Sequence, residues 1–182
     1  MVTSLKIGIT GLPNAGKTYA LLKVIEMLEE AGGRVGGMVT EPILKDGRKR
    51  GFWIMDWATK RREVLTSPEI DDKGEAGSPG VDIEVLNGIG VHAVRKATEE
   101  ADIIVVDEVG KREMESEEFV EAVKDALDSD KPVILTLHKK SRNPLLQDIR
   151  RRDDVRILEV TPVNRNLLPY KIVGLLKGEW AR

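Results

Sequence analysis

Residues 11–18 read Gly11-Leu12-Pro13-Asn14-Ala15-Gly16-Lys17-Thr18 (GLPNAGKT), and this stretch decides the fold. It fits the pattern G-x-x-x-x-G-K-[ST], in which glycines let the backbone curl so that successive N–H groups point at phosphate oxygens. In such a phosphate-binding loop (P-loop), Lys17 is predicted to reach the β- and γ-phosphates, and Thr18 to offer its hydroxyl to Mg²⁺. The alternative is a glycine turn with a purely structural role.

The segments on either side of the loop are those that a P-loop requires. Residues 5–10 predict a short strand, and a helix is predicted after the loop because apolar residues recur at positions i, i+3, i+4 and i+7. Those residues are Leu21, Val24, Ile25 and Leu28. The helix adds its positive N-terminal end to the phosphate site, and Gly32-Gly33 is predicted to end it. This context favours phosphate binding.

Beyond the loop, strands alternate with helices, the pattern of a mostly parallel sheet covered on both faces. Further strands are predicted at 34–40, 51–57, 63–66, 103–106, 132–137 and 155–161. Helices are predicted at 83–101, from Ser116 onwards, from Asn143-Pro144 to the basic run 150–152, and at 167–176. Asp46-Gly47 is a turn signal, so 51–57 and 63–66 are interpreted as antiparallel strands appended to the sheet. The predicted fold class is α/β: a P-loop NTPase fold in one domain, residues 1–182, with a mostly parallel sheet flanked by helices and an appended antiparallel hairpin.

Composition narrows the classes of protein. Of 182 residues, 41% are hydrophobic, which is enough for a core and excludes wholesale disorder. The 29 basic and 31 acidic residues argue against a protein that coats nucleic acid or an anionic membrane. No apolar run approaches the roughly 18 residues that span a bilayer, and no secretory signal is expected. Cysteine is absent, which excludes disulfides, a thiolate nucleophile and cysteine metal sites, and a soluble cytoplasmic protein is expected. The composition, with many charged residues and a single glutamine (Gln147), is typical of proteins from thermophiles.

An acidic pair closes the apolar strand 103–106. Asp107 is predicted to hold Mg²⁺ directly or through water beside Thr18, as a second P-loop motif of the Walker B type does. Glu108 is then free to orient or deprotonate an attacking water. Gly110 lets the chain turn sharply near the phosphates. The alternative is a pair of solvated carboxylates at the start of a loop.

The P-loop, the segment DEVGKREMESEEF (107–119) and TPVNRN (161–166) together resemble the small thermostable nucleoside-triphosphatase family of archaea and bacteria, which has a vertebrate relative. The resemblance covers nearly the whole chain and implies a kinase-like P-loop fold that hydrolyses several nucleoside triphosphates with Mg²⁺. The family pattern after the strand is D-E-[IV]-G-x-M-E-[LM], and Arg112 stands where methionine is common. The resemblance implies that a second stretch lines the nucleotide site with the P-loop: Ile103, Ile104, Val105, Val106, Asp107, Glu108, Val109 and Gly110.

Three polar residues outside these motifs are candidates for the same site. His138 follows the strand 132–137 at the carboxyl edge of the sheet, where parallel sheets bind ligands. It could sense the γ-phosphate, position water, or be a satisfied histidine at a strand end. Arg165 could stack on a base or pair with phosphate, and Asn164 could bond a base edge or fix the turn. The alternative for both is a capped turn with a solvated arginine.

Several conspicuous features are interpreted as structural. The aromatic residues near the hairpin are expected to pack there rather than form a platform for a base: Phe52, Trp53 and Trp57. The basic run 150–152 is interpreted as a solvated helix end, and His92 as structural. Residues 67–80 predict a long surface loop that could serve as a lid.

These predictions converge on Mg²⁺-dependent hydrolysis of nucleoside 5′-triphosphates to the diphosphate and phosphate, with low base selectivity. Lys17 and Glu108 are the predicted catalytic residues, and Thr18 and Asp107 the predicted metal ligands. A nucleotide or small-molecule kinase of the same fold and a nucleotide-dependent binding switch stay open as alternatives. The sequence lacks the N-K-x-D guanine signature and the L-S-G-G-Q transporter signature. Nucleoside triphosphates are the predicted partners, and neither nucleic acid nor a membrane is indicated.

Overall fold

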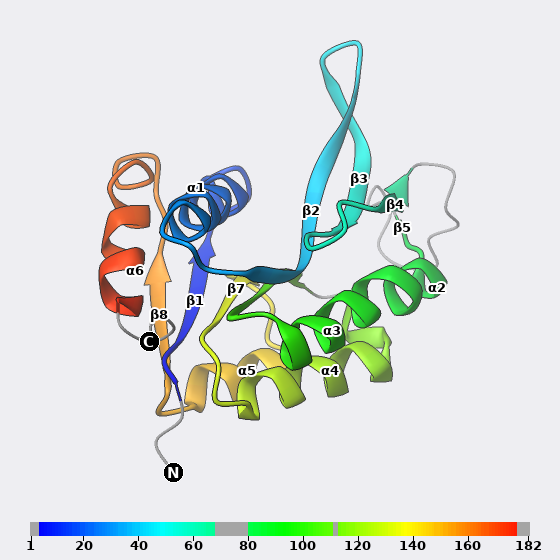
Figure 1. Cartoon of the computed structure of the whole chain (residues 1–182). Coiled ribbons are helices and arrows are strands. Elements are labelled where there is room, and N and C mark those ends of the chain that lie inside the picture. The colour runs from blue at the N-terminus through cyan, green and yellow to red at the C-terminus, as the bar shows by residue number, and fades with distance from the viewer. Residues whose placement is uncertain (1–3, 68–79, 111–112, 178–182) are drawn as a thin grey trace.

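The P-loop joins the first strand of a sheet to a helix that covers one face of it (Figure 1). The structure is a computed structural model that describes residues 4–67, 80–110 and 113–177. Strand β1 (Lys6–Gly11) has two parallel neighbours, β7 (Val133–His138) and β8 (Val155–Glu159). Helix α1 (Lys17–Glu30) follows the loop directly, as the motif predicted.

The described strands form one eight-stranded sheet in the order β5-β4-β3-β2-β6-β7-β1-β8. The remaining strands are β2 (Val35–Lys45), β3 (Arg48–Asp56), β4 (Arg62–Ser67), β5 (Gly80–Val81) and β6 (Ile103–Val109). Strands β2, β6, β7, β1 and β8 are parallel, whereas β3, β4 and β5 pair antiparallel at one side. The α/β fold class with an appended antiparallel hairpin is therefore confirmed.

Helices cover both faces of the sheet, with α1 and α6 (Leu168–Leu176) on one and α3, α4 and α5 on the other (Figure 1). The latter are α3 (His92–Glu100), α4 (Glu117–Asp128) and α5 (Pro144–Arg151). The predicted helix starts are confirmed, because Ser116 accepts a hydrogen bond from Phe119 N and Asn143 from Leu146 N. None of the helices in the described part has the length and apolar character that crossing a lipid bilayer requires.

The single helix predicted at 83–101 contains an irregularity. It begins as α2 (Ile83–Val85), continues as a π-helical segment (Leu86–Val91) and then becomes α3. The apolar residues still reach the core, with Leu86, Ala93 and Ala97 buried. The hydrophobic spacing gave no sign of this π segment, a rare helix type.

Strands β2 and β6 extend further than predicted, and both differences concern the site. Strand β6 continues to Val109, so Asp107 and Glu108 are strand residues and do not start a loop. The register between β6 and β7 shifts after Val106, which turns this end of β6 out of the regular ladder. Strand β2 continues to Lys45 and forms a long hairpin with β3.

The interpretation of residues 150–152 as a solvated helix end agrees with the exposed Arg150 and Arg151 but was wrong for Arg152. Arg152 pairs with Asp154 and Asp128, and these carboxylates raise its pKa. Arg150 donates hydrogen bonds to three backbone carbonyls, those of His138, Lys139 and Ser141. The basic run therefore fastens the end of α5 to neighbouring elements.

We expect Gly37→Ala to lower the free energy of unfolding by about 3–5 kcal/mol. Gly37 has φ of +122°, and a Cβ there would lie 2.0 Å from the carbonyl oxygen of Val105 in β6. Gly32→Ala is the control, because Gly32 also has positive φ (+92°) but no atom within 4 Å of an added Cβ. It should cost only about 1 kcal/mol. Urea unfolding of both variants measures the difference, and equal losses would contradict this close approach of β2 and β6.

Candidate active site

The P-loop is held open by its backbone conformation. Gly16 has φ of +107°, a left-handed conformation that side chains rarely adopt, and Asn14 has φ of +66°. Leu12 O accepts a hydrogen bond from Ala15 N at 3.0 Å, which closes the turn. No side chain caps the first turn of α1. The N–H groups of that turn are therefore directed at the position an anion takes in a P-loop.

The two predicted catalytic residues contact each other across the site. Lys17 Nζ lies 3.3 Å from Glu108 Oε1, and their side chains are 10% and 29% exposed. The lysine comes from the start of α1 and the glutamate from the end of β6. The fold therefore brings together two motifs that lie 91 residues apart in the sequence.

Asp107 is fully buried, and hydroxyl and amide donors surround its carboxylate. Thr18 Oγ1 lies 3.1 Å from Oδ2, and Thr136 Oγ1 lies 2.6 Å from Oδ1. Thr40 donates twice to Oδ2, from its hydroxyl at 3.2 Å and from its backbone N–H at 3.3 Å. Burial raises the pKa of Asp107 and the nearby Glu108 charge adds to this effect, while the hydrogen bonds oppose it.

Thr40 and Thr136 were missed by the sequence interpretation. Thr136 is a polar residue inside the otherwise apolar strand β7, which was the available signal. Thr40 follows the part of β2 that pairs with β6, and its spacing to Asp107 gave no indication of contact. Both residues hold the carboxylate in place rather than face a ligand directly.

Glu113 is a third carboxyl group in this region that the sequence interpretation did not assign. It begins a short 3₁₀ turn (Glu113–Glu115), and its Oε2 lies 2.7 Å from where a Cβ of Gly110 would be. Burial raises the pKa of Glu113 to about 7, and the charges of Glu108 and Asp107 also raise it. Arg112, where the sequence departs from the family pattern, lies outside the described residues.

Thr18 and Asp107 could hold a divalent cation. Their hydroxyl and carboxylate are hard oxygen ligands, and they lie within 3.1 Å of each other. No group of three or more His, Cys, Asp or Glu residues suited to a metal occurs in the described ranges. This small donor set fits Mg²⁺, which uses one or two protein ligands and completes its shell with water and phosphate oxygens.

The other predicted nucleotide-binding residues divide by exposure. The side chains of Ile103, Ile104, Val105, Val106 and Val109 are all fully buried in the core. They place Asp107 and Glu108 rather than offer surface to a ligand. Within the loop, Leu12, Pro13 and Asn14 are exposed and Ala15 is buried.

Asn164 and Arg165 differ in whether their polar groups are already hydrogen-bonded. Asn164 Oδ1 accepts from Thr161 N at 2.7 Å, and its Nδ2 donates to Glu159 O at 2.8 Å, so its amide fixes the turn. Arg165 is exposed, and its Cδ lies 3.5 Å from where a Cβ of Gly16 would be. Arg165 is therefore the residue of this pair with a free polar group beside the P-loop.

His138 lies at the same edge, in register with Gly11 of the P-loop. Its Nδ1 accepts a hydrogen bond from Ser141 N at 3.1 Å, which fixes the ring and leaves the proton on Nε2. His138 lies two residues after Thr136 on β7, so the two side chains are on the same face of the sheet. That face also carries Asp107, which Thr136 contacts. Both sequence interpretations of His138 therefore stay open. His92, in contrast, is exposed at the start of α3.

Comparison with known proteins identifies the family. The family model described as NTPase matches residues 6–173.

The chain belongs to this nucleoside-triphosphatase family.

Nucleoside-triphosphatase THEP1 of Thermoplasma volcanium is 39% identical over 97% of this chain and 99% of its own length. The Methanosarcina barkeri protein of the same name is 44% identical over 93% of this chain and 96% of its own. Two solved structures are similar. The crystal structure of THEP1 from the hyperthermophile Aquifex aeolicus is 30% identical with TM-score 0.82, covering 95% of this chain and 99% of that one. The solution structure of a human cancer-related nucleoside triphosphatase is 28% identical with TM-score 0.79, covering 96% and 98%. The resemblance seen in the sequence is thus confirmed.

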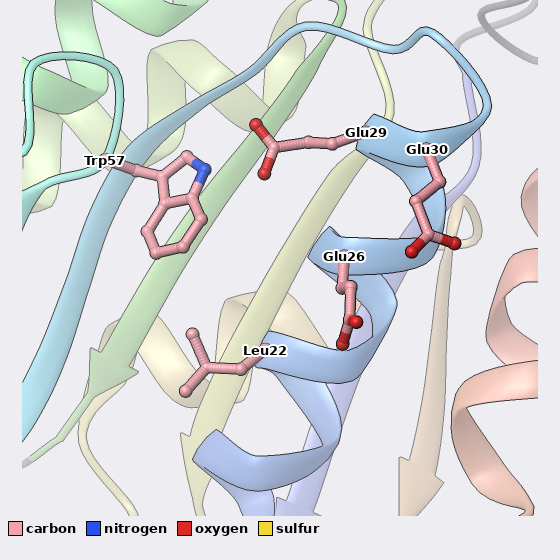
Figure 2. A pocket seen from close by; sticks show the side chains of 5 residues that line it. All are labelled: Leu22, Glu26, Glu29, Glu30 and Trp57. Atoms are coloured by element: carbon pink, nitrogen blue, oxygen red, sulfur yellow. The ribbon is translucent and has the colours of Figure 1, made fainter.

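Trp57 of this nucleoside-triphosphatase family member lies at the end of α1 away from the P-loop, and Phe52 and Trp53 lie in the hairpin. Trp57 follows β3 and lines a pocket of about 640 Å³ with Leu22, Glu26, Glu29 and Glu30 of α1 (Figure 2). The glutamates at 29 and 30 end α1, whereas the P-loop precedes it. Within the hairpin, Phe52 pairs with Pro42, and Trp53 stacks under Arg62 with 4.6 Å from its Cζ to the ring centroid. These contacts agree with hairpin packing.

We expect Glu113→Gln to stabilise the protein at pH 8 more than at pH 5. An acid whose pKa rises on folding destabilises the native state once it ionises, so its favourable contribution is present below about 4.5 and lost as pH rises through about 7. Glutamine removes this titration. The variant's gain in free energy of unfolding should be larger at pH 8 by on the order of 2 kcal/mol, measured by urea unfolding without Mg²⁺. The exposed Glu115→Gln is the control, and an equal gain at both pH values would contradict a raised pKa of Glu113 in the folded protein.

Proposed function

We propose that this family member hydrolyses nucleoside 5′-triphosphates to the diphosphate and phosphate in a Mg²⁺-dependent reaction. The observation that carries the proposal is the contact between Thr18 and Asp107, 3.1 Å apart at the mouth of the P-loop. It joins a phosphate-binding loop to a buried carboxylate through two oxygen ligands. This is the arrangement that a triphosphate with a divalent cation requires.

The protein's own groups divide the work of binding. The P-loop N–H groups and the start of α1 bind the phosphate oxygens, and Lys17 contacts the β- and γ-phosphates. Thr18 and Asp107 would hold Mg²⁺, which neutralises charge on the β- and γ-phosphates when bound. Thr40 and Thr136 keep the Asp107 carboxylate in one orientation through their hydrogen bonds.

Glu108 is the group that activates water. Its carboxylate pairs with Lys17 at 3.3 Å, and a triphosphate competes for the same ammonium group. When Lys17 turns to the phosphates, the Glu108 carboxylate becomes free to accept a proton from water. The water oxygen bonds to the γ-phosphorus while the bond to the β,γ-bridging oxygen breaks. The electron pair of that bond leaves with the diphosphate.

Base selectivity is proposed to be low. Both ends of the Asn164 amide are bound within its own turn, which holds the side chain there rather than toward a base edge. Arg165 could stack on a base, and stacking does not distinguish one base from another. Strong discrimination requires buried hydrogen bonds to the base. ATP and GTP should therefore both be substrates.

The kinase alternative depends on an acceptor pocket and a lid. The lid predicted at 67–80 lies outside the described residues apart from its two ends. No contact of the described residues favours either a kinase or a binding switch over the hydrolase.

The proposal also includes a cytoplasmic location, because the chain has no cysteine that could form a disulfide in an oxidising compartment.

We expect Glu108→Gln to separate chemistry from binding. Glutamine keeps the size and hydrogen bonding of the side chain but cannot accept the proton, so kcat should fall roughly 10²–10⁴-fold. Affinity for a non-hydrolysable ATP analogue should stay near that of the wild type, because one negative charge beside the phosphates is removed. Single-turnover hydrolysis and analogue binding measure the two effects.

Asp107→Asn is the comparison and Glu115→Gln the control. Loss of the Asp107 charge should weaken Mg²⁺ dependence and nucleotide binding together. The exposed Glu115 should be replaceable without effect on either. Wild-type turnover by Glu108→Gln would contradict the proposed role and would direct attention to His138.

A further inference from the structure

The β2–β3 hairpin begins at the site itself. Strand β2 pairs with β6 as far as Met38 and Val106, and two residues later Thr40 binds the Asp107 carboxylate. Beyond Pro42 and Phe52, where the pairing of β3 with β4 ends, the hairpin continues as β2 and β3 alone and projects from the sheet (Figure 1). Its base is therefore fixed by the same carboxylate that would hold the metal.

One lysine near the tip of this hairpin contacts the P-loop. Lys49 Nζ lies 2.9 Å from Asn14 Oδ1, a contact between residues 35 positions apart. The same ammonium group is 6.0 Å from the Phe52 ring centroid. Asn14 is exposed in the middle of the loop whose N–H groups bind phosphate. An exposed cation is thus held at the rim of the phosphate cradle by a neutral oxygen.

A triphosphate in the cradle would be a stronger partner for this ammonium group than the Asn14 amide. Charge-assisted bonds to phosphate are about twice as strong as bonds between neutral groups. Lys17 is the only cationic residue within the P-loop sequence itself. Several negative charges on the bound triphosphate therefore call for a further cation, and P-loop enzymes that supply one within the chain gain rate from it.

We propose that Lys49 is a catalytic residue whose ammonium group moves from Asn14 onto the terminal phosphate and stabilises the charge that develops there during hydrolysis. This inference rests on the proposed function.

The position of the hairpin places Lys49 nearer to the expected terminal phosphate than to the expected nucleoside. Helix α6 and the turn that carries Arg165 lie on one side of α1, and the hairpin lies on the other (Figure 1). Arg165 reaches Gly16, whereas the hairpin rises from Thr40 and the metal-side carboxylate Asp107. Lys49 therefore approaches from the side of the metal and the γ-phosphate.

Neighbouring basic residues provide matched comparisons. Lys45, Arg48 and Arg50 are exposed at the same hairpin tip. Within residues 4–67, 80–110 and 113–177, no hydrogen bond or ion pair joins the Arg50 side chain to the P-loop. If Lys49 acted only through the positive charge at the hairpin tip, removing Arg50 should have the same effect. If Lys49 contacts the phosphate directly, only its own removal should lower activity.

The test measures hydrolysis and binding by Lys49→Ala, Lys49→Arg and Arg50→Ala in the full chain with Mg-ATP. Lys49→Ala should lower kcat about 10–100-fold, with KM changed less than about threefold, as loss of an interaction made in the transition state requires. Mg-ADP with aluminium fluoride, which imitates the transferring phosphate, should bind at least tenfold more weakly, and Mg-ADP alone should bind as in the wild type. Lys49→Arg should keep most of the activity, because it keeps the charge, and Arg50→Ala should stay within about twofold of the wild type.

Three results would overturn the inference. These are wild-type kcat in Lys49→Ala, an equal loss in Arg50→Ala, and equal weakening of Mg-ADP with and without aluminium fluoride. Each leaves the proposed hydrolysis standing, because the wild type still turns over. Absence of turnover in the wild type itself would instead overturn the proposed function, and this inference with it.

Discussion

The site depends on the hydrogen bonds that surround one buried carboxyl group. Asp107 is fully buried, and an isolated charge in that position would be costly unless donors surround it. The donors come from three separate elements, Thr18 of α1, Thr40 of β2 and Thr136 of β7. The strand order that places β6 between β2 and β7, with α1 over the same face, is what allows all three to converge.

The charges around that carboxylate account for the affinity proposed for a metal-bound triphosphate. Three acids gather there, Asp107, Glu108 and Glu113, and the acidic neighbours raise the pKa of Asp107 and of Glu113. Lys17 offsets part of this charge by its contact with Glu108. A divalent cation would relieve the remaining repulsion, and bound phosphates would free Glu108 by taking Lys17. The same electrostatic imbalance would therefore account for both the proposed metal binding and the proposed release of Glu108.

The sequence predicted the fold and the two motifs because both depend on local patterns. The P-loop spacing, the apolar strand before Asp107 and the cap at Ser116 each lie within a few residues of one another. Thr136 and Lys49 could not be assigned, because their partners lie 29 and 35 residues away and only the folded chain brings them together. Arg152 was misread for the same reason, since Asp128 approaches it from another helix. Asn164 could be placed at a turn, but only the structure showed that its amide is used there.

The most direct test of this account is release of phosphate by the full chain from Mg-ATP and Mg-GTP, without any acceptor, beside the variant Lys17→Ala. The account predicts turnover of both nucleotides with kcat/KM within about tenfold of each other. It also predicts no turnover by Lys17→Ala, which should fold normally because its lysine lies outside the core. Phosphate transfer only when an acceptor is added, or unchanged turnover in Lys17→Ala, would contradict it.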